Sequence, residues 1–170
     1  MEDLKALMGR FPHPGRLEWI GVRGERRGPV LVLAQVQAQA GQGLVGDHYR
    51  PGARGARQVT LIQEEDLPVV AALCRRPDLD PGLLRRNLVI SGINLAALKG
   101  MRFRIGAALL EGTGPCHPCS RMEAVLGPGG YNALRGRGGL TARVLASGLL
   151  RLGDQVVVLG PAPAPEPGQG

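Results

Sequence analysis

The stretch TARVLASGLLRLGDQVVVL, residues 141–159, decides the fold. Its apolar runs are too short for helices and rich in Val and Leu, so they predict β-strands. Gly153 and Asp154 predict a tight turn between two of them. Similar short segments, separated by Gly-rich turns, occur upstream at 16–23, 29–39, 59–62, 87–90 and 103–113. Together they predict a mainly β protein, a closed or nearly closed β-barrel with a few short helices.

Two helices are expected, over residues 2–9 and 63–78. The second begins QEEDLP and ends CRRPD, which suits the helix dipole and a proline stop. Cys74 shares one face of this helix with apolar residues, which predicts a core thiol. Residues 1–160 are expected to form one domain. The last ten residues, PAPAPEPGQG, predict a flexible tail because they offer almost nothing to a core.

Length and composition limit the classes of protein to which the chain can belong. The 170 residues, 44% of them hydrophobic, suffice for one folded core. Three cysteines are too few for a secreted disulfide framework, and the N-terminus lacks the pattern of an export signal, so a cytoplasmic location is expected. No apolar run approaches the roughly 20 residues that span a bilayer, so no membrane association is expected.

The formal net charge of +7 comes almost entirely from arginine, since Lys5 and Lys99 are the only lysines. This balance favours an anionic partner held by bidentate contacts, either a phosphate or a carboxylate; a solvated Arg-rich surface is the alternative. Nucleic acid is an unfavoured partner, because the chain has only two Phe, two Tyr and one Trp for base stacking and its arginines are dispersed.

The segment GTGPCHPCSRME, residues 112–123, contains two of the three cysteines, Cys116 and Cys119. Four interpretations remain open: half of a zinc site, a thioredoxin-like redox pair, two buried thiols, or one activated thiolate on a loop. A zinc site would need further ligands from His13, His48, Cys74 or His117. A redox pair should open a helix, and Ser120 with Glu123 makes a possible capping box there. Arg121, or the start of a helix at Ser120, would favour the thiolate form. A thiolate is a suitable ligand for a transition metal.

Four stretches taken together resemble the MOSC domain, the module named for the C-terminal domain of molybdenum-cofactor sulfurase. They are HPCSRM (117–122), RGRGGLTARVLASGLLRLGDQVVV (135–158), GLVGDHYRPGARGARQVTLI (43–62) and RRNLVISGINLAALKGMRFRIGAALLEGTG (85–114). Their order and spacing are similar to those of small stand-alone bacterial members, over roughly residues 17–160.

The resemblance implies a β-barrel that binds the molybdenum cofactor, a pterin with a dithiolene and a phosphate. Cys119 matches the family cysteine that ligates molybdenum or carries sulfur, and Cys116 is the second choice. The Arg-x-Asn run of one branch transfers to Arg85 and Asn87. A family-level association with pyridoxal phosphate comes with the same resemblance.

The implied function is reduction of N-hydroxylated small molecules at a cysteine-ligated molybdenum. The chain has no flavin or iron–sulfur motif, so a separate electron-donor protein is expected. The alternative is a carrier that delivers persulfide sulfur or the cofactor to a client metalloenzyme. Arginine side chains are expected to clamp the cofactor phosphate, and Asn87 is expected to add a hydrogen bond. His48 is expected to line the substrate pocket. Glycines 52, 55, 138 and 139 would let backbone N–H groups approach the cofactor closely. The arginines are Arg54, Arg57, Arg85, Arg86 and Arg121.

Overall fold

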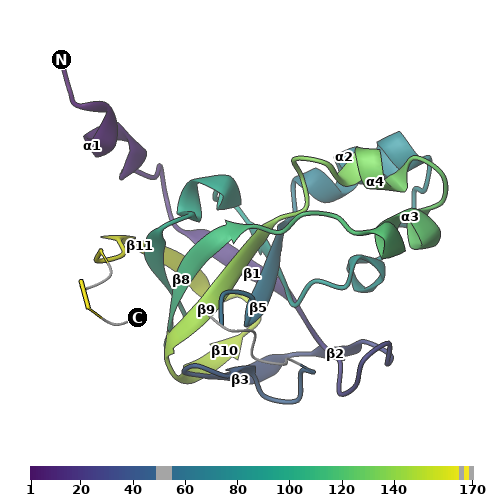
Figure 1. Ribbon diagram of the computed structural model, residues 1–170, viewed down its shortest axis with the longest axis horizontal. Coiled ribbons are helices and arrows are strands. Elements are labelled where there is room, and N and C mark those ends of the chain that lie inside the picture. Colours follow the sequence, from purple (N-terminus) through teal and green to yellow (C-terminus); the bar gives the residue numbers. More distant parts are fainter. Residues whose placement is uncertain (49–54, 165–166, 169–170) are drawn as a thin grey trace.

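A computed structural model describes residues 1–48, 55–164 and 167–168 of the chain. Strand pairing closes into a ring, because the last strand hydrogen-bonds back to the first. The closed barrel predicted from the short apolar strands is confirmed (Figure 1). In order around the ring the strands are β1 (Gly15–Val22), β6 (Leu88–Ser91), β5 (Val59–Gln63), β9 (Leu140–Ala146), β8 (Ala108–Pro115), β7 (Met101–Ile105) and β11 (Gln155–Pro161).

The remaining strands lie beside the ring. β2 (Leu31–Leu33) pairs with β1 in an antiparallel hairpin, so the predicted segments 16–23 and 29–39 lie side by side there. A small second sheet has the order β10-β3-β4, formed by β10 (Gly148–Arg151), β3 (Gln35–Gln39) and β4 (Gly43–Leu44). The segment expected as one strand over 103–113 is two, because a turn at Gly106, with φ +55°, folds β7 back onto β8.

The predicted turn at Gly153 and Asp154 is present, and the chain passes there from one sheet to the other. The Asp154 amide donates to the Arg151 carbonyl at 3.0 Å, and the Arg151 amide donates to the Asp154 carboxylate at 2.7 Å. The strand before the turn, β10, pairs with β3, whereas the strand after it, β11, pairs with β7 and β1. This turn therefore leads the chain from the small sheet into the barrel.

Strands β5 and β6 are buried on both faces. They pair in parallel, which requires a crossover connection, and that connection contains α2 (Asp66–Cys74) and the 3₁₀ helix η1 (Pro81–Leu84). Leu61 and Leu88 face the barrel interior, while their neighbours Ile62 and Val89 face outward into a second apolar cluster. Two-sided burial explains why the sequence here reads as continuous apolar runs, VTLI and NLVI.

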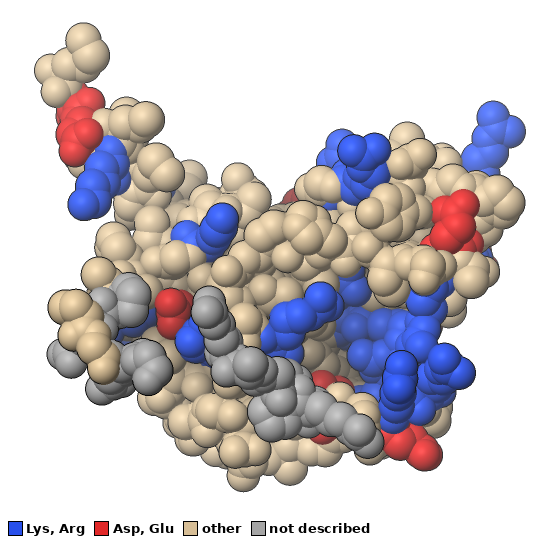
Figure 2. Space-filling view, in the orientation of Figure 1, with Lys and Arg blue, Asp and Glu red and all other residues tan. Residues whose placement is uncertain are grey.

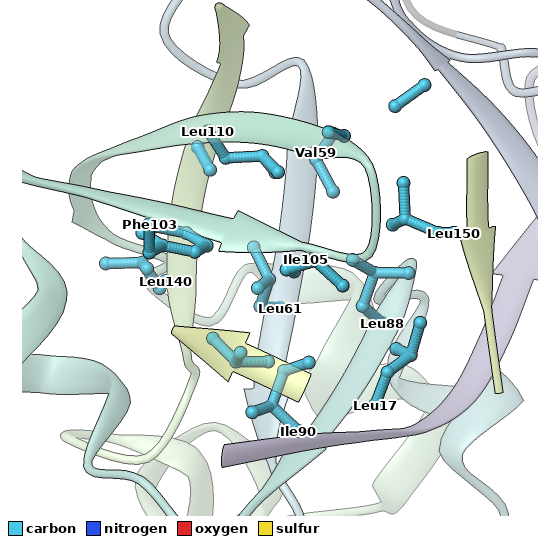
Figure 3. Close-up of a cluster of buried hydrophobic side chains, with 14 of the residues drawn as sticks. Leu17, Val59, Leu61, Leu88, Ile90, Phe103, Ile105, Leu110, Leu140 and Leu150 are labelled. Atoms are coloured by element: carbon cyan, nitrogen blue, oxygen red, sulfur yellow. The ribbon is translucent and has the colours of Figure 1, made fainter. Parts of the chain in front are cut away.

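The hydrophobic core consists of two clusters. The first fills the barrel, and Figure 3 shows its side chains converging between the strands. The second lies outside the barrel, under α2, α3 (Ser120–Leu126) and α4 (Gly130–Leu134), which gather on one side of the molecule in Figure 1. Cys74, predicted to be a core thiol, is only partly buried and packs at the margin of this second cluster. The second cluster comprises Ile62, Val70, Leu84, Val89, Met122, Leu126 and Leu134.

The ends of the chain contribute little to either cluster. The expected first helix is α1 (Leu4–Met8), which buries no residue and stands away from the barrel in Figure 1. Strand β11 continues through Pro161, one residue past the expected domain boundary, and the Ala162 amide donates to the Gly100 carbonyl. A further 3₁₀ helix, η2 (Leu95–Leu98), precedes β7. Among the helices of the described residues, none has the length and apolar character needed to cross a membrane.

The predicted capping box at the start of α3 is not formed. Cys119 occupies the N-cap position without a side-chain capping bond, and Glu123 points elsewhere. The Glu123 carboxylate accepts hydrogen bonds from the backbone amides of Gly129 (2.7 Å) and Tyr131 (2.8 Å). These bonds, the one from Tyr131 most strongly, lower the pKa of Glu123. Glu123 therefore ties α3 to the segment that begins α4.

We expect Glu123→Gln to lower the thermal unfolding midpoint at neutral pH, because the carboxylate is the better acceptor for both amides. A lowered carboxyl pKa stabilises the fold above the unfolded-state pKa, and this contribution is lost as the pH falls through the folded-state pKa. The difference between wild type and variant should therefore begin to shrink as the pH falls below the unperturbed glutamate pKa of about 4.3. Glu2→Gln, in an exposed ion pair, is the control. A difference in unfolding midpoint that is the same at neutral pH and in the acidic range would contradict this role of Glu123.

Candidate functional site

One cavity, of about 320 Å³, lies where the barrel meets helix α3. Its arginines come from the end of β1 (Arg23), the approach to β5 (Arg57) and the approach to β6 (Arg85 and Arg86), and the first residues of α3 close the other side. Figure 2 shows basic side chains gathered in this region, below α3 and α4. We call it the arginine cavity; its lining residues are Arg23, Arg57, Arg85, Arg86, Cys119, Ser120, Arg121 and Met122.

Arg86 is the buried centre of this cavity, with only 7% of its surface exposed. Its Nε donates to the Gly138 carbonyl at 2.8 Å and one terminal nitrogen donates to the Leu84 carbonyl at 2.9 Å. The other terminal nitrogen, Nη2, is buried and finds no acceptor among the described residues. A buried donor without a partner costs about 1–3 kcal/mol, so this nitrogen favours an external acceptor.

Electrostatics reinforces that preference. Burial lowers the pKa of Arg86; the nearby sulfurs of Cys116 and Cys119 oppose this shift and Arg57 adds to it. Burial also lowers the pKa of Arg85, and repulsion from Arg23 and Arg121 adds to the effect. Within the described residues, no ion pair involves any of the five cavity arginines. Asp47, beside Arg23, offsets only part of this charge, so the cavity carries an excess of positive charge that is complementary to an anion.

The two cysteines of the segment 112–123 have different surroundings. Both are free thiols; Cys119 is exposed and lines the arginine cavity, whereas Cys116 is buried, with 1% of its surface exposed. The Cys116 sulfur accepts a hydrogen bond from Arg57 at 3.7 Å, and its backbone amide donates to the Gly139 carbonyl. Cys119 thus contributes an exposed thiol to the lining of the cavity, whereas Cys116 is buried beside Arg57.

The other interpretations of this segment find little support in the geometry. Within the described residues, no three His, Cys, Asp or Glu side chains gather as a metal-binding group. The segment does connect a strand to a helix, as in thioredoxin-like pairs, but strand β8 is antiparallel to both its neighbours, unlike the α/β setting of those proteins. The arrangement offers one exposed thiol beside several guanidinium donors.

Asn87 does not reach the arginine cavity, although a role in cofactor binding was predicted for it. It is buried, and its side-chain oxygen accepts from the Thr60 amide at 3.0 Å and from the Thr60 hydroxyl at 3.2 Å. Its side-chain nitrogen donates to the Gly21 carbonyl at 3.2 Å. Asn87 therefore joins the strands β1, β5 and β6 that carry the arginines.

Several predicted residues take other positions. His48 lines a neighbouring cavity together with Arg85. Gly138 and Gly139 approach the backbone of Cys116 and Leu61, so their missing side chains allow close packing within the protein. Arg54 and glycine 52 lie outside the described residues. Of the predicted cofactor ligands, the structure brings Cys119 together with Arg57, Arg85, Arg86 and Arg121.

Arg23 is the cavity residue that the sequence did not single out. It directly follows β1, and its terminal nitrogen donates to the Arg85 carbonyl at 3.3 Å. Its backbone amide donates to the Asp47 carboxylate at 2.9 Å. The only sequence signal was an arginine at the end of the predicted strand 16–23, and its place in the site depends on the pairing of β1 with β6.

Comparison with known proteins places the chain in a family. The family model described as the MOSC domain matches residues 47–157. The chain belongs to the MOSC domain family. This confirms the resemblance inferred from the four sequence stretches, and it supports a role related to the molybdenum cofactor in general.

Solved structures share the fold of this MOSC domain at low sequence identity. The YuaD protein from Bacillus subtilis aligns with a TM-score of 0.75 and 21% identity, over 86% of this chain and 96% of that chain. YiiM from Geobacillus stearothermophilus aligns with a TM-score of 0.68 and 20% identity, over 86% of this chain and 75% of that chain. YiiM from Escherichia coli aligns with a TM-score of 0.68 and 18% identity, over 88% of this chain and 72% of that chain. No curated protein matches the chain in sequence.

We expect Asn87→Ala to lower the free energy of unfolding by about 2–4 kcal/mol, because it leaves buried groups of Thr60 and Gly21 without partners. Urea denaturation measures the effect. Asn132→Ala serves as the control. Asn132 lies on α4, and its side chain makes only an exposed hydrogen bond with Arg135, so this substitution should change the free energy of unfolding little. Equal stability of the two variants would contradict the structural role of Asn87.

Proposed function

We propose that this MOSC domain binds the molybdenum cofactor in the arginine cavity and reduces N-hydroxylated compounds there. The observation that carries the proposal is that one cavity holds both the exposed thiol of Cys119 and the unpartnered buried nitrogen of Arg86. These two features are complementary to the two ends of this cofactor, which are a metal that prefers sulfur and an anionic phosphate.

The residues that line the arginine cavity suit the molybdenum cofactor. Cys119 would supply a sulfur ligand to the metal from the wall of the cavity. Arg86 would donate its free Nη2 to an anionic oxygen, since its other donors already hold Gly138 and Leu84. The remaining cavity arginines form no ion pair within the part of the chain that the structure describes, and their planar forks suit phosphate oxygens.

The bound cofactor would supply the two-electron chemistry, and the protein supplies position and protons. Reduction of an N-hydroxyl group breaks the N–O bond, consumes two electrons and two protons, and releases water and the amine. The electrons come from a separate donor protein. His48 lines the neighbouring cavity, where its imidazole can hydrogen-bond the substrate.

We expect Cys119→Ser to lower the molybdenum content by at least about tenfold, because even loss of a supporting residue around a metal costs 10–100-fold in affinity. The measurement is elemental analysis for molybdenum and zinc on protein made in a cofactor-producing host. Cys74→Ser, a thiol that does not line the cavity, is the matched control. Full molybdenum content and full reduction of hydroxylamines in the Cys119 variant would rule the proposal out.

A second candidate function is sulfur or cofactor delivery to a client metalloenzyme, and the exposure of the Cys119 thiol favours it. In this role Cys119 carries a persulfide, and its outer sulfur passes to an acceptor. Purified protein should then release thiocyanate from Cys119 on treatment with cyanide, and should not turn over hydroxylamines with an added reductant. Cyanide treatment that releases no sulfur would exclude persulfide delivery.

A further inference from the structure

A second cavity, of about 210 Å³, adjoins the arginine cavity. The two share the side chains of Arg23, Arg85 and Arg121 as a common wall. Glu25, Arg26 and His48 line only the second cavity, and Cys119 lines only the first. We call the second one the His48 cavity.

The His48 cavity has an excess of positive charge. Four arginines line it, against the single carboxylate of Glu25. Asp47 lies nearby, but its carboxylate already accepts from the backbone amide of Arg23. Among the described residues, the guanidiniums of Arg26 and Arg121 make neither an ion pair nor a hydrogen bond. Free guanidinium forks beside an imidazole are complementary to a phosphate group.

The described lining of the arginine cavity and the His48 cavity is dominated by arginine. Among the described residues, those that line the two cavities include no Phe, Tyr or Trp. Charge is therefore the recognition feature that the described lining provides most strongly. A ligand whose reactive end lies near Cys119 would place a group several bonds away beside Arg26.

We infer that the His48 cavity binds a phosphate group on the substrate, so that this protein prefers phosphorylated N-hydroxylated compounds to their neutral counterparts. The inference rests on the proposed function, which assigns the arginine cavity to the cofactor. Arg26 and His48 contact the substrate phosphate, and the three shared arginines lie between the anion of the substrate and that of the cofactor. Arg26 is thus a specificity residue and has no part in holding the metal.

The test compares N-hydroxycytidine with its 5′-monophosphate, using isothermal titration calorimetry on the full chain made in a cofactor-producing host. We expect wild-type protein to bind the monophosphate at least about tenfold more tightly than the nucleoside, as one or two charge-assisted hydrogen bonds provide. Arg26→Ala should remove about tenfold for the monophosphate, leave the nucleoside unchanged, and leave the molybdenum content unchanged.

Arg104→Ala is the matched control, because Arg104 is exposed on β7, lines neither cavity, and carries the same charge. Equal affinity of wild type for the two ligands would overturn the inference. An equal loss in the Arg104 variant would overturn it as well, since a general charge effect would then explain the result. Loss of molybdenum in the Arg26 variant would assign the cavity to the cofactor, also against the inference. Wild-type protein without molybdenum is the distinct result that contradicts the proposed function itself.

Discussion

The buried guanidinium of Arg86 is the interaction on which the site depends. Two of its nitrogens bind the carbonyls of Leu84 and Gly138 and so join the start of β6 to the segment before β9. The third is buried without an acceptor among the described residues, close to the sulfurs of Cys116 and Cys119. A cation removed from water is costly unless it is paired. We therefore expect the cavity around Arg86 to be most stable when an anion occupies it.

The barrel explains how that cation is held. Strands β5 and β6 are covered on one face by the barrel interior and on the other by α2, α3 and α4. Asn87 locks these strands to β1, and Glu123 ties α3 to α4. As a result, Arg86 at one strand end and Cys119 at the start of α3 line one cavity, although 33 positions separate them in the sequence.

Sequence patterns predicted the barrel because short apolar strands and Gly turns report local structure directly. The resemblance to a family predicted Cys119 and Arg85 as site residues, and the loop arginines added Arg86. Other features depended on long-range pairing. Arg23 gains its role only through the register of β1 against β6, and Asn87 looked like a ligand because its burial between Thr60 and Gly21 is invisible in the sequence. Glu123 fitted a local capping pattern, but amides of the next helix bind it instead.

The central claim is that the sulfur of Cys119 completes a metal site whose anionic part lies against Arg86. Molybdenum K-edge X-ray absorption on the purified protein tests it most directly, because the technique counts the sulfur atoms bound to the metal. We predict two sulfurs from the cofactor dithiolene plus one from the protein in wild type, and only the two on the molybdenum that the Cys119→Ser variant retains. Identical sulfur counts in the two proteins would contradict it.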